Sequence, residues 1–310
     1  METRKLGTNG PELSALGLGC NNFGMRIDAA QTAAVVGAAI DEGITHFDTA
    51  EMYGEGASEE FLGAALGTRR DQVVIATKFL PRPGGQPFSP GDLARRITEA
   101  VDGSLTRLRT DRIDLYYQHY PDPDAPLDEL VETLDVLVQQ GKILSVGISN
   151  VDADQLSGSV AAFGGRSARP EVAQVEWNLL TRGVEGDIVP AAAAIETSIV
   201  PYFPLASGLL TGKYSSGEPF PDDSRFAAMP YFAEVASEQN LETVRRLTEI
   251  ATDNDRSIVE LALGWLLSHD IVASVIAGAT TPEQVRANAA ASTWRLDAEQ
   301  LAEVDAANTP

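Results

Sequence analysis

The stretch HFDTAEMYG at residues 46–54 is a short apolar segment that ends in a carboxylate and leads directly into a loop carrying a tyrosine. A continuous apolar run of this length is typical of a strand buried on both faces, as in a parallel sheet. We therefore expect a strand over residues 46–48. Both titratable side chains, Asp48 and Tyr53, then lie at its carboxyl end, where parallel α/β folds carry their ligand sites.

The same alternation of a short apolar run and a longer helical pattern fills the chain. Expected strands lie at residues 15–18, 46–48, 73–78, 114–119, 145–149, 173–176, 198–202 and 272–276. Expected helices lie at residues 29–42, 58–66, 90–108, 127–140, 152–163, 185–196, 257–267 and 282–291. Strands and helices that alternate in these numbers predict an α/β protein with the fold of a (β/α)8 TIM barrel.

Other segments lie outside this alternation. The dipeptide Asn9-Gly10 between residues 4–6 and 13–15 predicts an N-terminal β-hairpin, and residues 241–253 and 297–307 predict two extra helices. The longest connection, from about 205 to 233, contains several prolines and glycines, and we interpret it as a functional loop over the barrel mouth. No break in composition divides the sequence, so we expect one domain over residues 1–310.

Charge and composition restrict the possible partners. The 310 residues carry 23 basic and 45 acidic side chains, a net charge of −22, which repels nucleic acid and anionic lipid. We expect no nucleic-acid or membrane partner, a cytoplasmic location, and a monomer or weak homo-oligomer. The single cysteine, Cys20, excludes an internal disulfide framework, and the three histidines are too far apart for a metal site. An anionic cofactor would need a local positive patch.

Four titratable residues are predicted at or just beyond consecutive strand ends: Asp48, Tyr53, Lys78 and His119. Each alone has an ordinary structural explanation, as a turn cap, a packed ring, a solvated charge or a core imidazole. The carboxyl ends of barrel strands share one face, so these side chains are expected to converge although they are distant in sequence. Their joint placement on one rim favours a catalytic site.

At this point the sequence resembles the aldo-keto reductase superfamily over nearly its whole length. The motif Phe47-Asp48-Thr49-Ala50-x-x-Tyr53-Gly54, followed by Ser58-Glu59, is similar to the Asp–Tyr signature of that family. Lys78 and His119 match the other two members of its catalytic tetrad. The resemblance implies an NAD(P)H-dependent oxidoreductase that reduces an aldehyde or ketone to an alcohol, with a small-molecule carbonyl compound as substrate.

The chemistry of these residue types agrees with that implication. Carbonyl reduction needs a hydride at carbon, which a nicotinamide supplies, and a proton at oxygen. A free tyrosine titrates near about 10, and an adjacent ammonium is expected to lower that pKa. We therefore expect Tyr53 to be the general acid, Lys78 to act on its pKa, and Asp48 to keep Lys78 charged. His119 is expected to orient or polarise the carbonyl.

The resemblance also implies residues that bind the cofactor. Ser149, Asn150 and Gln174 match residues that bind the nicotinamide carboxamide, and Tyr202 matches the aromatic residue that stacks on the ring. The segment after strand seven resembles a loop that wraps the pyrophosphate. The turn before the last barrel helix resembles the site of the adenosine 2′-phosphate and adenine. These two segments contribute Pro204, Leu205, Gly208, Lys213, Gly278, Thr280, Gln284 and Asn288.

Three questions stay open at the level of the sequence. Residues 278–281 contain no Lys or Arg, so NADPH is the expected cofactor while NADH remains possible; the direction of Arg286 decides part of this. A cofactor-binding regulatory protein with little turnover, as among potassium channel β subunits, is an alternative. Schiff-base chemistry at Lys78 is another. Candidates for an apolar substrate pocket are Phe23, Met52, Tyr120, Phe220, Phe226 and Tyr231.

Overall fold

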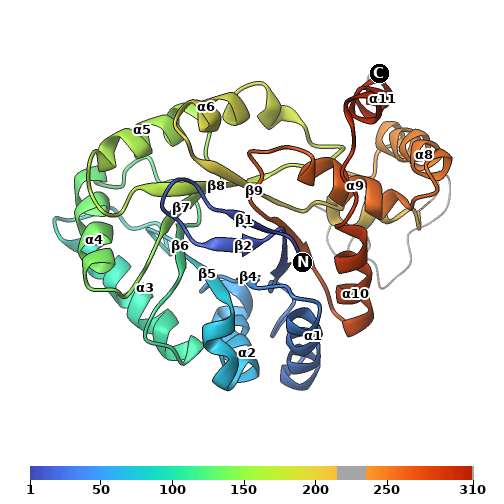
Figure 1. Cartoon of the computed structure of the whole chain (residues 1–310). Coiled ribbons are helices and arrows are strands. Elements are labelled where there is room, and N and C mark those ends of the chain that lie inside the picture. The colour runs from blue at the N-terminus through green and yellow to red at the C-terminus, as the bar shows by residue number, and fades with distance from the viewer. Residues whose placement is uncertain (215–234, 309–310) are drawn as a thin grey trace.

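A computed structural model describes residues 1–214 and 235–308. Eight parallel strands form one sheet in the order β10-β3-β4-β5-β6-β7-β8-β9, surrounded by helices (Figure 1). The strands are β3 Leu16–Gly19, β4 His46–Asp48, β5 Val74–Phe79, β6 Leu115–Gln118, β7 Val146–Ser149, β8 Pro170–Glu176, β9 Ser198–Tyr202 and β10 Val275–Gly278.

The sheet closes between β9 and the segment that leads into β10. The Ile199 amide donates to the Ile271 carbonyl at 2.9 Å, and the Ala273 amide donates to the Ile199 carbonyl at 3.0 Å. The predicted TIM barrel is therefore confirmed. The last strand was predicted too early, because Val272 forms only an isolated bridge to Ile199 and the paired strand extends instead to Gly278.

Helices cover the outside of the barrel, as Figure 1 shows. They are α1 Ala29–Asp41, α2 Ala57–Leu66, α3 Asp92–Leu108, α4 Leu127–Gln139, α5 Ala153–Phe163, α6 Ile188–Ala194, α9 Ile258–Leu267 and α10 Pro282–Ala291. The two predicted extra helices are also present, as α8 Glu238–Asp253 and α11 Ala298–Ala307. Helix α6 is shorter than predicted, because the separate turn η3, Gly183–Glu185, precedes it and Asp187 caps its first amide.

The predicted hairpin is formed by β1 Thr3–Lys5 and β2 Glu12–Ser14 and lies across one end of the barrel (Figure 1). Its Leu6 and Leu13 are fully buried in one cluster with side chains such as Leu115 and Val200. The Thr8 amide donates to the Glu171 carboxylate at 2.7 Å, near the start of β8. Because the hairpin covers the amino ends of the strands, the carboxyl ends are left for a site.

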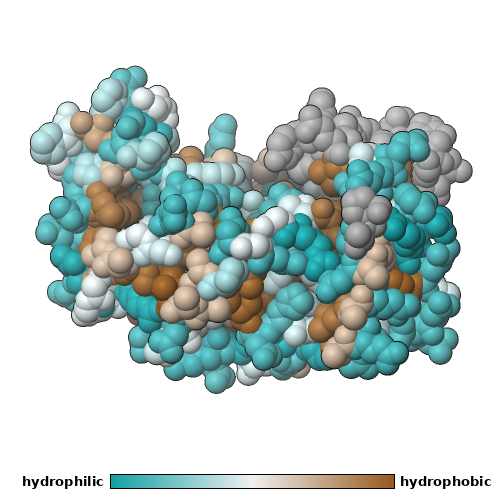
Figure 2. All heavy atoms as spheres, turned by 90° about the horizontal axis from the view of Figure 1, so that it is seen from above, coloured by the Kyte–Doolittle hydropathy of each residue, from teal (hydrophilic) through white to brown (hydrophobic). Residues whose placement is uncertain are grey.

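Hydrophilic residues cover most of the face in Figure 2, and the apolar ones between them form separate groups. No helix in the described ranges is both long and apolar enough to cross a lipid bilayer. Most of the predicted mouth loop lies outside the described residues, as do Phe220, Phe226 and Tyr231. Phe23 is fully buried in the core, so it does not belong to the predicted substrate pocket.

Candidate active site

A cavity of about 1060 Å³ opens at the carboxyl ends of the strands. It brings together every predicted site residue except Lys78, which is fully buried directly beneath it. Its walls include Asp48, Tyr53, His119, Ser149, Asn150, Gln174, Tyr202, Pro204, Leu205, Gly208, Lys213, Gly278, Thr280, Gln284 and Asn288. Barrel closure therefore gathers residues that are spread over most of the sequence.

Asp48 and Lys78 form a buried ion pair at the base of the cavity. Asp48 ends β4, and Lys78 lies on the neighbouring β5, two positions beyond the residue paired with Asp48. The Lys78 ammonium donates to Asp48 Oδ1 at 2.5 Å and to the Thr49 carbonyl at 2.8 Å. Burial is the largest single effect and disfavours the ammonium, but the charges of Asp48 and Tyr53 and the hydrogen bonds to them together outweigh it and raise the pKa of Lys78. A raised pKa keeps the amine protonated, which argues against Schiff-base chemistry.

Tyr53 begins the turn η1, Tyr53–Gly56, and its ring lies beside this ion pair. The Lys78 ammonium is 5.3 Å from the centre of the ring. Burial raises the pKa of Tyr53, the charge of Lys78 lowers it, and Asp48 raises it again, so the net pKa lies above its usual value. The expectation of a lowered pKa was therefore wrong for the net effect, because desolvation of the phenolate exceeds the contribution of Lys78. Tyr53 keeps its proton at neutral pH.

His119 faces Tyr53 from the end of β6. The two ring centres are 5.8 Å apart and the planes meet at 83°. Tyr120 also stacks on the imidazole, with 4.8 Å between the ring centres, and is 48% exposed. Burial and then the charge of Lys78 lower the pKa of His119 to about 3. The imidazole is therefore neutral at physiological pH and offers one N–H as a hydrogen-bond donor.

The residues that end β7 and β9 form a connected network. Ser149 Oγ donates to the Gln174 carbonyl at 2.9 Å. Asn150 donates to the His119 carbonyl at 2.8 Å and accepts from the Tyr202 hydroxyl at 2.7 Å. Asn150 is thus held by protein groups on both sides of its amide, and it also fixes the chain beside His119. The Gln174 side chain reaches Asp48 rather than its strand neighbours.

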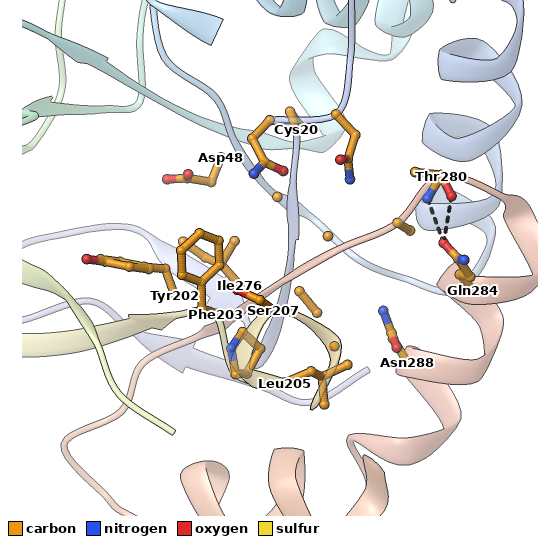
Figure 3. Close-up of a pocket in the computed structure, with 18 of the residues that line it drawn as sticks. Cys20, Asp48, Tyr202, Phe203, Leu205, Ser207, Ile276, Thr280, Gln284 and Asn288 are labelled. Atoms are coloured by element: carbon orange, nitrogen blue, oxygen red, sulfur yellow. Dashed lines mark hydrogen bonds between the residues drawn. The ribbon is translucent and has the colours of Figure 1, made fainter. Parts of the chain in front are cut away.

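The segment after β9 turns sharply around the cavity. Phe203, Ala206, Ser207 and Gly208 all have positive φ, between 45° and 106°. Non-glycine residues with positive φ are uncommon, and a run of them marks strained backbone of the kind found at ligand sites. The turn η4, Ala206–Thr211, belongs to this segment. Figure 3 shows Phe203, Leu205 and Ser207 bordering the cavity.

Helix α10 borders the far end of the cavity, where Thr280, Gln284 and Asn288 lie (Figure 3). The Thr280 amide donates to Gln284 Oε1 at 2.7 Å, and Thr281 caps the helix. Arg286 is not among the cavity-lining residues, and its guanidinium pairs with Glu283 on the same helix at 3.5 Å.

Sequence reasoning missed several cavity residues. Arg26 lies on the loop after β3, Ser207 lies in η4, and Glu260 lies on α9. Ala287 and Ala291 line the cavity from α10, four residues apart and next to Gln284 and Asn288. This spacing of small and polar residues on one helical face is the signal that would have found them. Met52, which is 46% exposed, and Tyr120, both candidates for the substrate pocket, line the cavity.

Cations and potential metal ligands are unevenly distributed around the cavity. Arg26 and Lys213 are the basic side chains that line it within the described residues, beside the carboxylates Asp48, Glu176 and Glu260. The Lys213 ammonium lies 5.1 Å from the centre of the Tyr214 ring. In residues 1–214 and 235–308, no three His, Cys, Asp or Glu side chains gather as a metal ion requires.

A closed TIM barrel with an Asp–Lys pair, a tyrosine and a histidine at its carboxyl rim defines a class of carbonyl-reducing oxidoreductases. The sequence model of the aldo/keto reductase family matches residues 15–309. The chain therefore belongs to this family, whose members use nicotinamide cofactors.

Relatives with different assigned roles are similar to the chain over most of its length. A probable voltage-gated potassium channel subunit beta from Oryza sativa subsp. japonica is 36% identical, covering 93% of this chain and 90% of the relative. Aldo-keto reductase YhdN from Bacillus subtilis (strain 168) is 34% identical, with 98% and 93% covered. L-glyceraldehyde 3-phosphate reductase from Escherichia coli (strain K12) is 33% identical, with 98% and 92% covered.

A solved structure is also similar. The holo form of the aldo-keto reductase AKR11C1 from Bacillus halodurans superposes with a TM-score of 0.82 at 31% sequence identity. The match covers 100% of this chain and 97% of that one.

Proposed function

We propose that this chain reduces an aldehyde or ketone to the alcohol with NADPH, and that Tyr53 donates the proton. The observation that carries the proposal is the grouping at the base of the cavity. Tyr53 lies between a charged Lys78, 5.3 Å from its ring centre, and a neutral His119, 5.8 Å between centres. A phenol and an imidazole N–H that face one cavity can both donate to an oxygen that gains charge.

The proton chemistry follows from the pKa directions. Hydride addition turns the carbonyl oxygen into an alkoxide, a much stronger base than a phenolate, so a phenol with a raised pKa still transfers its proton. The O–H bond of Tyr53 breaks and the O–H bond of the alcohol forms. Lys78 then stabilises the phenolate that remains, and Asp48 keeps Lys78 charged. His119 stays neutral and orients the carbonyl.

The residues around the cavity fit a nicotinamide dinucleotide. The cavity is large enough for an extended ligand and runs from Tyr53 to Asn288 on α10. Gln174 and Tyr202 are candidates for the nicotinamide end, and the positive-φ turn at Ser207 and Gly208 lets backbone approach a pyrophosphate. When bound, the reduced cofactor supplies the hydride.

The cations around the cavity bear on the preference for NADPH over NADH. Lys213 and Arg26 line the cavity and can balance phosphate charge. Arg286, the cation nearest in sequence to the predicted 2′-phosphate site, pairs instead with Glu283. Initial rates with each cofactor over a panel of carbonyl compounds decide this point. A kcat/KM higher with NADH would reverse the proposed preference.

The general acid is tested by Tyr53→Phe, which removes the hydroxyl and keeps the ring. We expect the variant to bind NADPH with nearly unchanged affinity, measured by quenching of NADPH fluorescence. Reduction of 4-nitrobenzaldehyde should fall by roughly 100-fold or more, the contribution typical of general acid catalysis. Unchanged reduction at neutral pH would exclude Tyr53 as the proton donor.

The parent protein is the control for Tyr53→Phe, and it also distinguishes an enzyme from a regulatory protein of the same fold. The relative named as a potassium channel subunit makes a regulatory protein of the same fold a second candidate. Such a protein would bind NADPH and leave the whole carbonyl panel unreduced, so that the parent and Tyr53→Phe would behave alike. Turnover by the parent protein that is lost in Tyr53→Phe supports the enzyme.

A further inference from the structure

The hydrogen bond between Gln174 and Asp48 spans the barrel. Gln174 Nε2 donates to Asp48 Oδ2 at 2.8 Å, although the residues are 126 positions apart. Gln174 lies on β8 and Asp48 on β4, and these strands are four places apart in the order of the eight-stranded sheet. In a closed barrel of eight strands, such strands face each other across the axis. Both side chains are buried, with 3% and 4% exposure.

The Gln174 backbone is fixed where this side chain leaves it. Residues Gln174 and Ser149 are paired in the parallel register of β7 and β8. The Gln174 carbonyl accepts the Ser149 hydroxyl at 2.9 Å and the Asn150 amide at 3.1 Å. A side chain that starts from a doubly held strand position reaches its target with little freedom.

The partner also determines the orientation of the Gln174 amide. An ionised carboxylate can only accept hydrogen bonds, so the amide must present its N–H group to Asp48. Its second N–H and its carbonyl oxygen then remain for other partners, among them Tyr117 and a ligand in the cavity, and the oxygen is an acceptor. A nicotinamide carboxamide carries N–H donors, so one side chain is suited to contact both the cofactor and the carboxylate of the ion pair.

Asp48 therefore has a different partner on each oxygen. Oδ1 accepts the Lys78 ammonium at 2.5 Å, and Oδ2 accepts Gln174. Without the second donor, a buried carboxylate oxygen is left unsatisfied, which is unfavourable and allows the group to rotate. Its negative charge would then act more strongly on Lys78 and Tyr53, and the phenolate of Tyr53 would be harder to form.

We propose that Gln174 is a positioning residue that acts through Asp48 to hold Lys78 against Tyr53, in addition to any contact with the cofactor. The inference rests on the proposed reductase function. Gln174 contributes to the rate by fixing the carboxylate of Asp48. One side chain therefore links binding of the cofactor to the position of the groups that act on Tyr53.

Two substitutions separate this role from cofactor binding. Gln174→Glu has nearly the same shape and keeps an acceptor toward the cofactor, but its ionised form cannot donate to Asp48. Gln174→Met keeps the length and removes both functions. Gln284→Met is the matched control, because Gln284 is also expected at the cofactor, while its side chain accepts from the Thr280 amide and makes no hydrogen bond to Asp48 or Gln174. Each variant is measured for NADPH affinity and for kcat of reduction between about pH 5 and 9.

We expect Gln174→Glu to bind NADPH and to lose about tenfold or more in kcat at neutral pH. Its kcat should recover as the pH falls, because the introduced carboxyl, once protonated, again donates to Asp48. Gln174→Met should lose kcat without recovery at any pH, and Gln284→Met should change NADPH affinity without introducing a new titration into the kcat profile. Profiles of both Gln174 variants parallel to that of the parent, with only the affinity changed, would overturn the proposal.

A measurement without turnover distinguishes this failure from failure of the proposed function. The 13C chemical shift of the Tyr53 phenol, assigned with Tyr53→Phe, reports its titration in the resting protein. We expect Gln174→Met to raise the pKa of Tyr53 by about one unit relative to the parent. An unchanged titration refutes the positioning role even if the parent reduces no carbonyl compound tested.

Discussion

At the scale of single residues, the core contains two histidines whose environments exclude charge. His46 is fully buried on β4, where its Nδ1 lies 2.9 Å from Ser274 Oγ, and its Nε2 has no partner within the described residues. Burial, as the largest effect, lowers the pKa of His46 to about 4. His119 is similar, with a pKa of about 3. Both imidazoles are neutral in the folded protein and titrate near about 6.5 when it unfolds.

This difference predicts a loss of stability in acid. As the pH falls from about 6.5 to about 4, the unfolded chain binds a proton at His46 and the folded chain does not, so the free energy of unfolding decreases. Below about 4 the contribution of His46 levels off. The shift corresponds to on the order of 3 kcal/mol at about 1.4 kcal/mol per unit. Urea unfolding of the parent and of His46→Gln across this range measures it.

The variant should show a shallower decrease of stability between pH 6.5 and pH 4, even if it is less stable at neutral pH. His119→Gln provides a second comparison, because its imidazole is buried at the other end of the barrel strands. Equal slopes for the parent and for His46→Gln would show that His46 has the same pKa in the folded and the unfolded chain.

At the scale of elements, the contact between α2 and α3 depends on one glycine. A Cβ on Gly63 of α2 would lie 2.5 Å from the carbonyl oxygen of Leu108, at the end of α3. That atom belongs to the backbone and cannot rotate away. Gly37 in α1 has nothing within 4 Å of the same position. The two glycines occupy similar helices, but only at Gly63 does close packing require a residue without a side chain.

We therefore expect opposite signs for the same substitution. Gly63→Ala should destabilise the protein by roughly 1–3 kcal/mol, because α2 and α3 must separate to admit the methyl group. Gly37→Ala should stabilise it by roughly 0.5–1 kcal/mol through helix propensity. Chemical denaturation followed by circular dichroism measures both values. Equal effects at the two sites would contradict the packing argument.

At the scale of the whole molecule, a net charge of −22 opposes compaction. Screening by salt reduces this self-repulsion, so the melting temperature should rise as ionic strength increases from about 0.05 to 0.5 M.

We also propose that the chain is one domain. Circular dichroism, which reports helices around the whole barrel, and fluorescence of the buried Trp177 and Trp265 should then show coincident transitions. Separate transitions would indicate two folding units.

Local patterns in the sequence were sufficient for the alternation of strands and helices. They also placed Asp48, Tyr53 and His119 at the carboxyl rim, with Lys78 one residue before the end of β5. They succeeded because buried parallel strands are continuous apolar runs and because their carboxyl ends share one face. The last strand was misplaced by three residues at its start, since the prediction began at Val272 and the pairing of β10 with β3 begins at Val275.

Only the tertiary structure decided which groups meet. The pairing of Gln174 with Asp48 and the raised pKa of Tyr53 follow from no local pattern. The pairing requires a barrel that is closed so that β8 faces β4. The raised pKa depends on how completely water is excluded from the Tyr53 phenol. Periodicity determines which face of an element is buried. Distances and desolvation arise only when elements far apart in the sequence pack together.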